Sequence, residues 1–86
     1  MTFGFRTLPE GVILGELSEK VFDVLQEHTS FPWPVMQAQC KRVGIDPTSL
    51  SKEELATMVV YFADAVGRFT SPERRQSVLA ELSTLL

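Results

Sequence analysis

The segment from Ser51 to Phe69 constrains the fold more than any other part of the chain, because it predicts one long helix that is apolar around most of its circumference. Its main stripe follows the three- and four-residue spacing of a helix face: Leu55, Met58, Val59, Phe62, Val66 and Phe69. Four neighbours widen the stripe: Val60, Tyr61, Ala63 and Ala65. Only a narrow polar line remains, in which Asp64 and Arg68 have the spacing of an ion pair. A helix of this kind is typical of the middle of a bundle.

Local signals set the limits of this helix and predict another one after it. Ser51 and Glu54 have the spacing of a capping box, in which each side chain accepts a hydrogen bond from the backbone of the other residue. The Thr-Ser-Pro-Glu sequence after Phe69 ends the helix, and Pro72 suits the first turn of the next one, where a proline loses no helical hydrogen bond. The apolar side of this last helix consists of valine and leucine: Val78, Leu79, Leu82, Leu85 and Leu86.

Two further helices are predicted upstream. The first runs from about Leu17 to His28, and its inner side is formed by Leu17, Val21, Val24, Leu25 and His28. The prolines of the following Phe-Pro-Trp-Pro sequence end it. The second helix begins near Pro34 and spans about ten residues. Gly44 suits the left-handed position at its end, and Ile45 is expected to fold back onto the last turn.

Residues 1–16 permit more than one structure. Phe3 and Phe5 alternate with small or polar residues, and a Pro-Glu-Gly turn sequence precedes a β-favouring run, which together favour an extended arm or a small hairpin. The competing interpretation is a helix begun by a capping box at Thr7–Glu10, in which two glycines would each cost about 1 kcal/mol. The predicted fold is therefore all-α: one domain (residues 1–86) with a compact bundle of about four helices, one of them short, and an N-terminal arm (residues 1–16).

Composition limits the functions that such a domain can have. A net charge of −3 and a pI near 5.0 disfavour a role built on nucleic-acid phosphates. With Cys40 as the one cysteine, no internal disulfide can form, and a reducing compartment is the simpler expectation. The chain shows neither a signal-peptide pattern nor an apolar run of the roughly 20 residues that span a bilayer, so we expect a cytoplasmic protein without a membrane segment.

No residues stand in a pattern that indicates catalysis or metal binding. His28 is expected to cap the end of its helix, and Cys40 is expected to act as a small buried hydrophobe. The carboxylates of the first helix alternate with Lys20, as on a solvated face. We therefore expect no catalytic residues, no metal site and no cofactor, and we expect that the protein is not an enzyme.

The surplus apolar surface of the predicted long helix, together with aromatic and leucine side chains elsewhere, favours a protein–protein interaction module, acting as an adaptor, a regulator or a subunit of a complex. Two prolines stiffen the segment that carries Phe31 and Trp33, which would lower the entropy lost on binding. Phe3 and Phe5 in the arm and Leu85 and Leu86 at the C-terminus extend the same hypothesis. The partner is expected to be another protein or a second copy of the chain, with a dimer favoured. The competing interpretation is that Phe31 and Trp33 close one end of the bundle.

Two alternatives remain open. A DNA-associated regulator could use a helix-turn-helix formed by residues 36–43, 44–50 and 51–69, together with the basic doublets Lys41-Arg42 and Arg74-Arg75. Against it, the expected recognition helix begins with Glu53 and Glu54, which would face phosphates. A small-molecule pocket could also lie between the helices, although a filled core is the simpler use of its four lining residues, which are Met36, Met58, Phe62 and Leu82.

Overall fold

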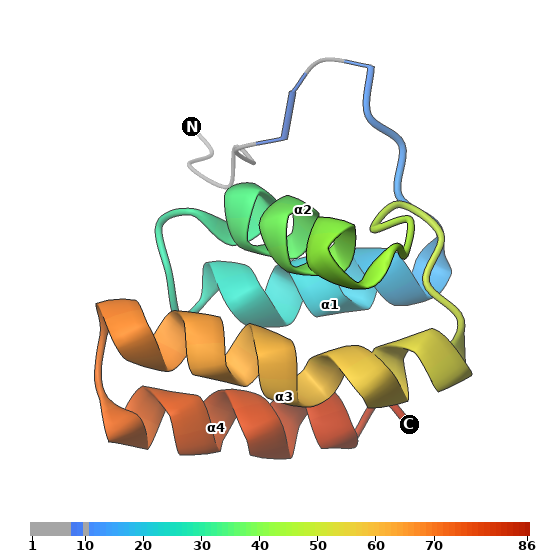
Figure 1. The fold of residues 1–86 in the computed structure, drawn as a ribbon. Coiled ribbons are helices and arrows are strands. Elements are labelled where there is room, and N and C mark those ends of the chain that lie inside the picture. Colours follow the sequence, from blue (N-terminus) through green and yellow to red (C-terminus); the bar gives the residue numbers. More distant parts are fainter. Residues whose placement is uncertain (1–7, 10) are drawn as a thin grey trace, which may run out of the picture.

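The computed structural model describes residues 8, 9 and 11–86, and this part of the chain contains four helices and no strand (Figure 1). The helices are α1 (Glu16–Gln26), α2 (Pro32–Val43), α3 (Lys52–Phe69) and α4 (Pro72–Ser83). The predicted all-α fold is thus confirmed. The predicted lengths are wrong in one respect, because α1, α2 and α4 have 11 or 12 residues each and α3 alone is long, with 18.

The helices pack in a ring, in which α3 contacts α2 and α4, and α1 contacts the same two helices from the other side. Figure 1 shows α3 and α4 side by side and running in opposite directions. Helix α3, which the sequence predicts as the central element, has more buried residues than any other helix and packs against both α2 and α4. Three of its side chains, Val60, Tyr61 and Phe69, are nevertheless exposed at different positions around the helix, although the sequence pattern places them on or beside the apolar stripe.

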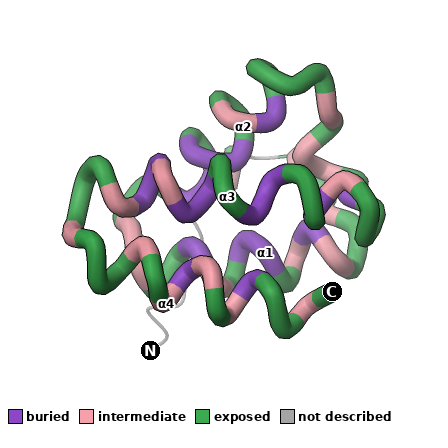
Figure 2. Tube along the Cα trace, turned by 60° about the horizontal axis from the view of Figure 1, so that its bottom comes forward, coloured by how far each residue is buried: buried purple, intermediate pink, exposed green. Residues whose placement is uncertain are grey.

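The core fills the space inside this ring, and buried residues alternate with exposed ones along the helices (Figure 2). Met36, Met58, Phe62 and Leu82 are completely buried within it, so these four side chains form packed core. The inner side of α1 differs from the prediction. It consists of Ser18, Val21, Phe22 and Leu25, whereas Leu17 and Val24 are only partly buried. The reason is that α1 lies between α2 and α4, which turns the Phe22 side inward.

Hydrogen bonds close the ends of α2 and α3 that meet at the Gly44–Ser51 connection. Gly44 has a φ of 85°, and the Ile45 N–H donates to the Cys40 carbonyl at 2.9 Å, as predicted for a left-handed helix end. At the start of α3 the predicted capping box is confirmed, with both Ser51–Glu54 hydrogen bonds at 3.1 Å.

A long-range hydrogen bond fixes α1 to the same connection. The buried Ser18 hydroxyl accepts from the Leu50 N–H at 2.9 Å, and it therefore satisfies a backbone donor that would otherwise have no partner in the interior. Just before α1, the Gly15 N–H donates to the Thr48 carbonyl at 2.8 Å. The two contacts hold the beginning of α1 against the α2–α3 connection.

The α3–α4 pair is held by an ion pair that differs from the predicted one. Asp64 accepts from the Arg75 guanidinium at 2.6 Å, so its cation comes from α4 rather than from Arg68 on its own helix. A glycine makes this approach possible, because a Cβ at Gly67 would lie 3.0 Å from the Cβ of Arg75. The Ser71 hydroxyl, which accepts from the Arg74 N–H at 3.2 Å, caps α4.

The N-terminal segment before α1 turns at Gly11, which has a φ of 90°, and the Val12 N–H donates to the Pro9 carbonyl at 3.3 Å. Leu8, Val12 and Leu14 pack against the core, whereas Ile13 between them is 85% exposed. This alternation is that of an extended chain that has one side on the bundle. Phe3 and Phe5 lie outside the described residues.

Candidate functional site

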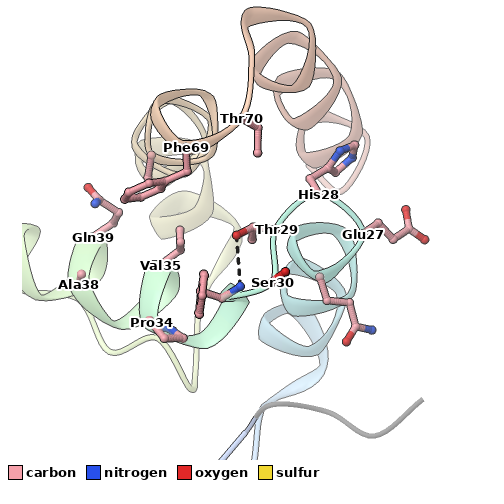
Figure 3. A pocket seen from close by; sticks show the side chains of 13 residues that line it. Glu27, His28, Thr29, Ser30, Pro34, Val35, Ala38, Gln39, Phe69 and Thr70 are labelled. Carbon is pink, nitrogen blue, oxygen red and sulfur yellow. Dashed lines mark hydrogen bonds between the residues drawn. The ribbon is translucent and has the colours of Figure 1, made fainter. Parts of the chain in front are cut away.

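An open groove with a volume of about 860 Å³ lies where the C-terminal ends of α1 and α3 meet the beginning of α2. Gln26 at the end of α1 and the following Glu27 form one end, and Ala38 and Gln39 of α2 form the other, as Figure 3 shows for the last three of these residues. The α1–α2 connection, with Thr29 and Ser30, lies between these ends. The site therefore combines three segments that are far apart in the sequence.

Two phenylalanines give the groove its apolar character. Phe31 is 65% exposed and Phe69 is 76% exposed, although both are large apolar side chains. Beneath them the groove is closed by Val35 and Ala65, which are almost completely buried. The fold thus leaves two aromatic rings exposed to solvent above a floor of buried side chains. Burying such a side chain completely is worth about 1.5–3 kcal/mol, so this surface can bind apolar groups.

The structure separates the predicted interaction residues instead of gathering them. Trp33 lies in the first turn of α2 and is 6% exposed, so the prediction that it sits on a loop is wrong. It shares the core with Met36 and Cys40, which follow at helical spacing. Leu85 is half-buried against the core, and Leu86 lies exposed at the end of the bundle away from the groove (Figure 1). Of the predicted residues that the structure describes, Phe31 alone belongs to the groove.

A cluster of polar side chains borders the α1 end of the groove. His28 contacts α4 through both ring nitrogens: Nε2 lies 2.9 Å from a Glu81 carboxylate oxygen, and Nδ1 lies 3.1 Å from an Arg74 nitrogen. Because a guanidinium can only donate and a carboxylate can only accept, these contacts fit the tautomer that carries its proton on Nε2. His28 therefore connects α1 to α4 rather than capping its own helix.

The same cluster is the one place in the described chain where three candidate metal ligands converge. Ligand atoms of Glu27, His28 and Glu81 all lie within 4.8 Å of one another. A metal on Nε2 would move the imidazole proton to Nδ1, where it would face the Arg74 donor. Metal-bound histidines ordinarily donate this proton to an acceptor. The Arg74 contact therefore opposes a metal site and leaves a cluster with two neighbouring carboxylates.

Cys40 is placed for packing and not for chemistry. Its side chain is completely buried on the inner side of α2. Burial, with smaller contributions from Glu54 and Asp46, raises the pKa of the thiol to about 11, so the thiol stays protonated at neutral pH. A protonated buried thiol is a poor nucleophile and a poor ligand.

The two basic doublets lie at opposite ends of the bundle. Lys41 and Arg42 are exposed in the last turn of α2, whereas Arg74 and Arg75 lie in the first turn of α4 (Figure 1). Arg75 is engaged by Asp64, and Arg74 contacts His28. The arrangement thus provides no single basic face for the DNA-binding alternative.

Comparisons with protein-family models, with curated proteins and with solved structures found no match to this chain. In the described part of the chain, no helix has the length and apolar character needed to cross a membrane. The candidate site therefore depends on the geometry of the groove alone.

Proposed function

We propose that this chain is a small non-catalytic protein–protein interaction module that binds an apolar segment in the groove between Phe31 and Phe69. The observation that carries the proposal is the exposure of both rings, 65% and 76%, in one hollow whose floor is already packed. Folding gains little from either ring, since neither fills the core. A second molecule would therefore be needed to remove the two rings from water.

The composition of the groove fits a protein surface as the occupant. Aromatic residues are enriched at the centre of protein interfaces, and polar residues form the rim. Here Phe31 and Phe69 lie near small or apolar side chains such as Pro34, Val35 and Ala38, while Glu27 and Gln39 stand at the ends. The groove is also open rather than enclosed, which suits a side chain or helix that belongs to a larger body.

Side-chain chemistry around the groove supports a binding role rather than a catalytic one. His28 is the one imidazole in the chain, and both of its nitrogens are engaged by Glu81 and Arg74. Cys40, the one thiol, is buried in the core and protonated. Neither group presents a free nucleophile or general base to a molecule in the groove.

Site-specific photocrosslinking tests the proposal. A photoreactive phenylalanine analogue is placed at Phe31 or at Phe69, and the protein is irradiated in an extract of its source cells. Val60 provides the matched control position, because it is also exposed on α3 but lies nine residues, or about two and a half turns, before Phe69 and so faces the opposite side of the helix. We expect a discrete protein adduct from the two groove positions and none from position 60. Adducts of equal yield from all three positions, or none from the groove, would refute the proposal.

A further inference from the structure

We infer that the occupant of the groove is a second copy of this chain, bound groove to groove about a two-fold axis. The inference rests on the proposed function, because it names the partner of the same site. It is carried by a feature that the apolar surface alone does not provide, which is the opposite charge of the two ends of the groove.

The α1 end of the groove is acidic. Glu27 lines it, and a carboxylate oxygen of Glu27 lies within 4.8 Å of one on Glu81. Two carboxylates at this separation repel each other and favour a cation between them. Arg74 is close by, and its guanidinium contacts His28 Nδ1 at 3.1 Å. The acidic end therefore favours a further cation that has several donors.

The α2 end of the groove carries such a cation. Gln39 lines this end, and its side-chain oxygen accepts from the Arg42 guanidinium at 3.2 Å. Arg42 is exposed in the last turn of α2, so its remaining donors face solvent. Figure 3 shows Gln39 and Glu27 on opposite sides of the groove, which places the arginine and the carboxylates at its two ends.

A two-fold axis through the groove makes these ends complementary. It brings Glu27 of one copy to Arg42 of the other, and the same contact occurs a second time by symmetry. The planar guanidinium suits a pair of carboxylates, since it has five donors in a fixed fork. Phe31 comes from the connection between the two ends, so the axis also brings the Phe31 side chains of the two copies towards each other, out of water.

The size of the groove predicts a weak dimer. Thirteen residues line it, compared with about 20–30 on each side of a standard stable interface. The association is therefore expected to depend strongly on protein concentration and, because of the paired charges, on salt. A monomer is expected in dilute solution.

Charge exchange tests the arrangement, measured by sedimentation equilibrium of the full chain over a wide concentration range in EDTA. We expect the wild type to self-associate, and Glu27→Arg and Arg42→Glu each to weaken the dimer about tenfold, because each converts two attractive contacts into repulsive ones. The double variant E27R/R42E should regain most of the loss, since it restores both pairs with the charges exchanged. Lys20→Glu is the control, as it makes the same charge change as Arg42→Glu on the exposed side of α1.

The outcomes separate the inference from the proposed function. A wild type that stays monomeric at every concentration, while its groove still crosslinks to a different protein, overturns the inference and leaves the proposed function standing. A dimer that Phe31→Ala does not weaken, or that E27R/R42E does not restore, overturns the groove-to-groove arrangement. Association that occurs in buffer without EDTA but is absent in EDTA overturns it as well, because a metal ion would then be the link. Circular dichroism of each variant confirms that the fold is retained.

Discussion

The two ends of the α2–α3 pair differ in how far folding has satisfied their polar and apolar groups. The closed end is where α2 ends and α3 begins. Backbone groups there are paired by the turn at Gly44, by the Ser51–Glu54 capping box and by the Ser18–Leu50 hydrogen bond. At the open end, Phe31 precedes the first residue of α2 and makes no side-chain cap bond within the described residues, and both Phe31 and Phe69 are mostly exposed to solvent. Residues at the closed end are thus engaged in contacts within the fold, whereas the two phenylalanines at the open end keep most of their surface in water, as the proposed binding role requires.

Trp33→Ala should have the largest effect on stability. It shows where the exposed open end stops and the core begins. Trp33 follows Phe31 by two residues but is buried with Met36 and Cys40. Its removal leaves a large cavity, so we expect a loss of about 3–5 kcal/mol in the free energy of unfolding. Urea denaturation followed by circular dichroism measures this loss, with Phe31→Ala as the control. A loss below about 1 kcal/mol would place Trp33 outside the core.

The different burial of Phe31 and Trp33 is a feature that the sequence analysis did not predict. Both flank Pro32, so local composition does not separate them. The register of α2 does, because a helix beginning at Pro32 puts Trp33 on the same side as Met36 and Cys40, at three- and seven-residue spacing. A start at Pro34, as predicted, hides that pattern.

Features that depend on residues a few positions apart were predicted correctly, whereas contacts between residues far apart in the sequence were not predicted. The capping box and Gly44 depend on residues a few positions apart, and both are confirmed. The Ser18–Leu50 bond joins residues 32 positions apart, and the groove joins three separate segments. Phe69 continues the apolar stripe of α3, but it is the last helical residue and extends beyond the core. Its position at a helix end is a second sequence signal for the groove, beside the predicted interaction residue Phe31.

Ser18→Ala tests the closed end at its buried hydrogen bond. The substitution removes the acceptor of the Leu50 N–H, which leaves a buried donor without a partner. Such a donor costs about 1–3 kcal/mol. The control at the open end is Ser30→Ala, where the residue is exposed and a change within about 0.5 kcal/mol is expected. Equal urea midpoints for the two variants would contradict the difference between the ends.

Gly44→Ala should cost about 1–2 kcal/mol, because the residue has a φ of 85° and a side chain is disfavoured in this left-handed conformation. Space is not the cause, since a Cβ there would meet no atom within 4 Å. Gly44→Asn should therefore lose less, as asparagine tolerates this region better. Thermal unfolding of the two variants measures the difference. An alanine variant as stable as the wild type would show that the turn does not depend on glycine.

Asp46 should make the closed end sensitive to acid. The backbone N–H and then the hydroxyl of Thr48 donate to its carboxylate at 2.9 and 2.8 Å and lower the pKa of Asp46. A lowered pKa in the folded state contributes stability above the unfolded value of about 3.9, and this contribution is lost as the pH falls through the folded value. Asp46→Asn should reduce the loss of stability on going from neutral to acidic pH. An unchanged pH profile would mean that these bonds do not contribute.

The smallest effects on stability are expected at the open end, from Phe31→Ser and Phe69→Ser. Both rings are mostly in water in the folded chain, as they are in the unfolded one, so the free energy of unfolding should change by no more than about 0.5 kcal/mol. Binding in the groove should nevertheless be lost, because each serine removes an apolar ring from the proposed interface. Val60→Ser, on the opposite side of α3, should leave both stability and binding unchanged. Urea denaturation of each variant measures its stability, and sedimentation measures its association. If the free energy of unfolding of either phenylalanine variant fell by more than about 1.5 kcal/mol, its ring would belong to the core and would not be available for binding.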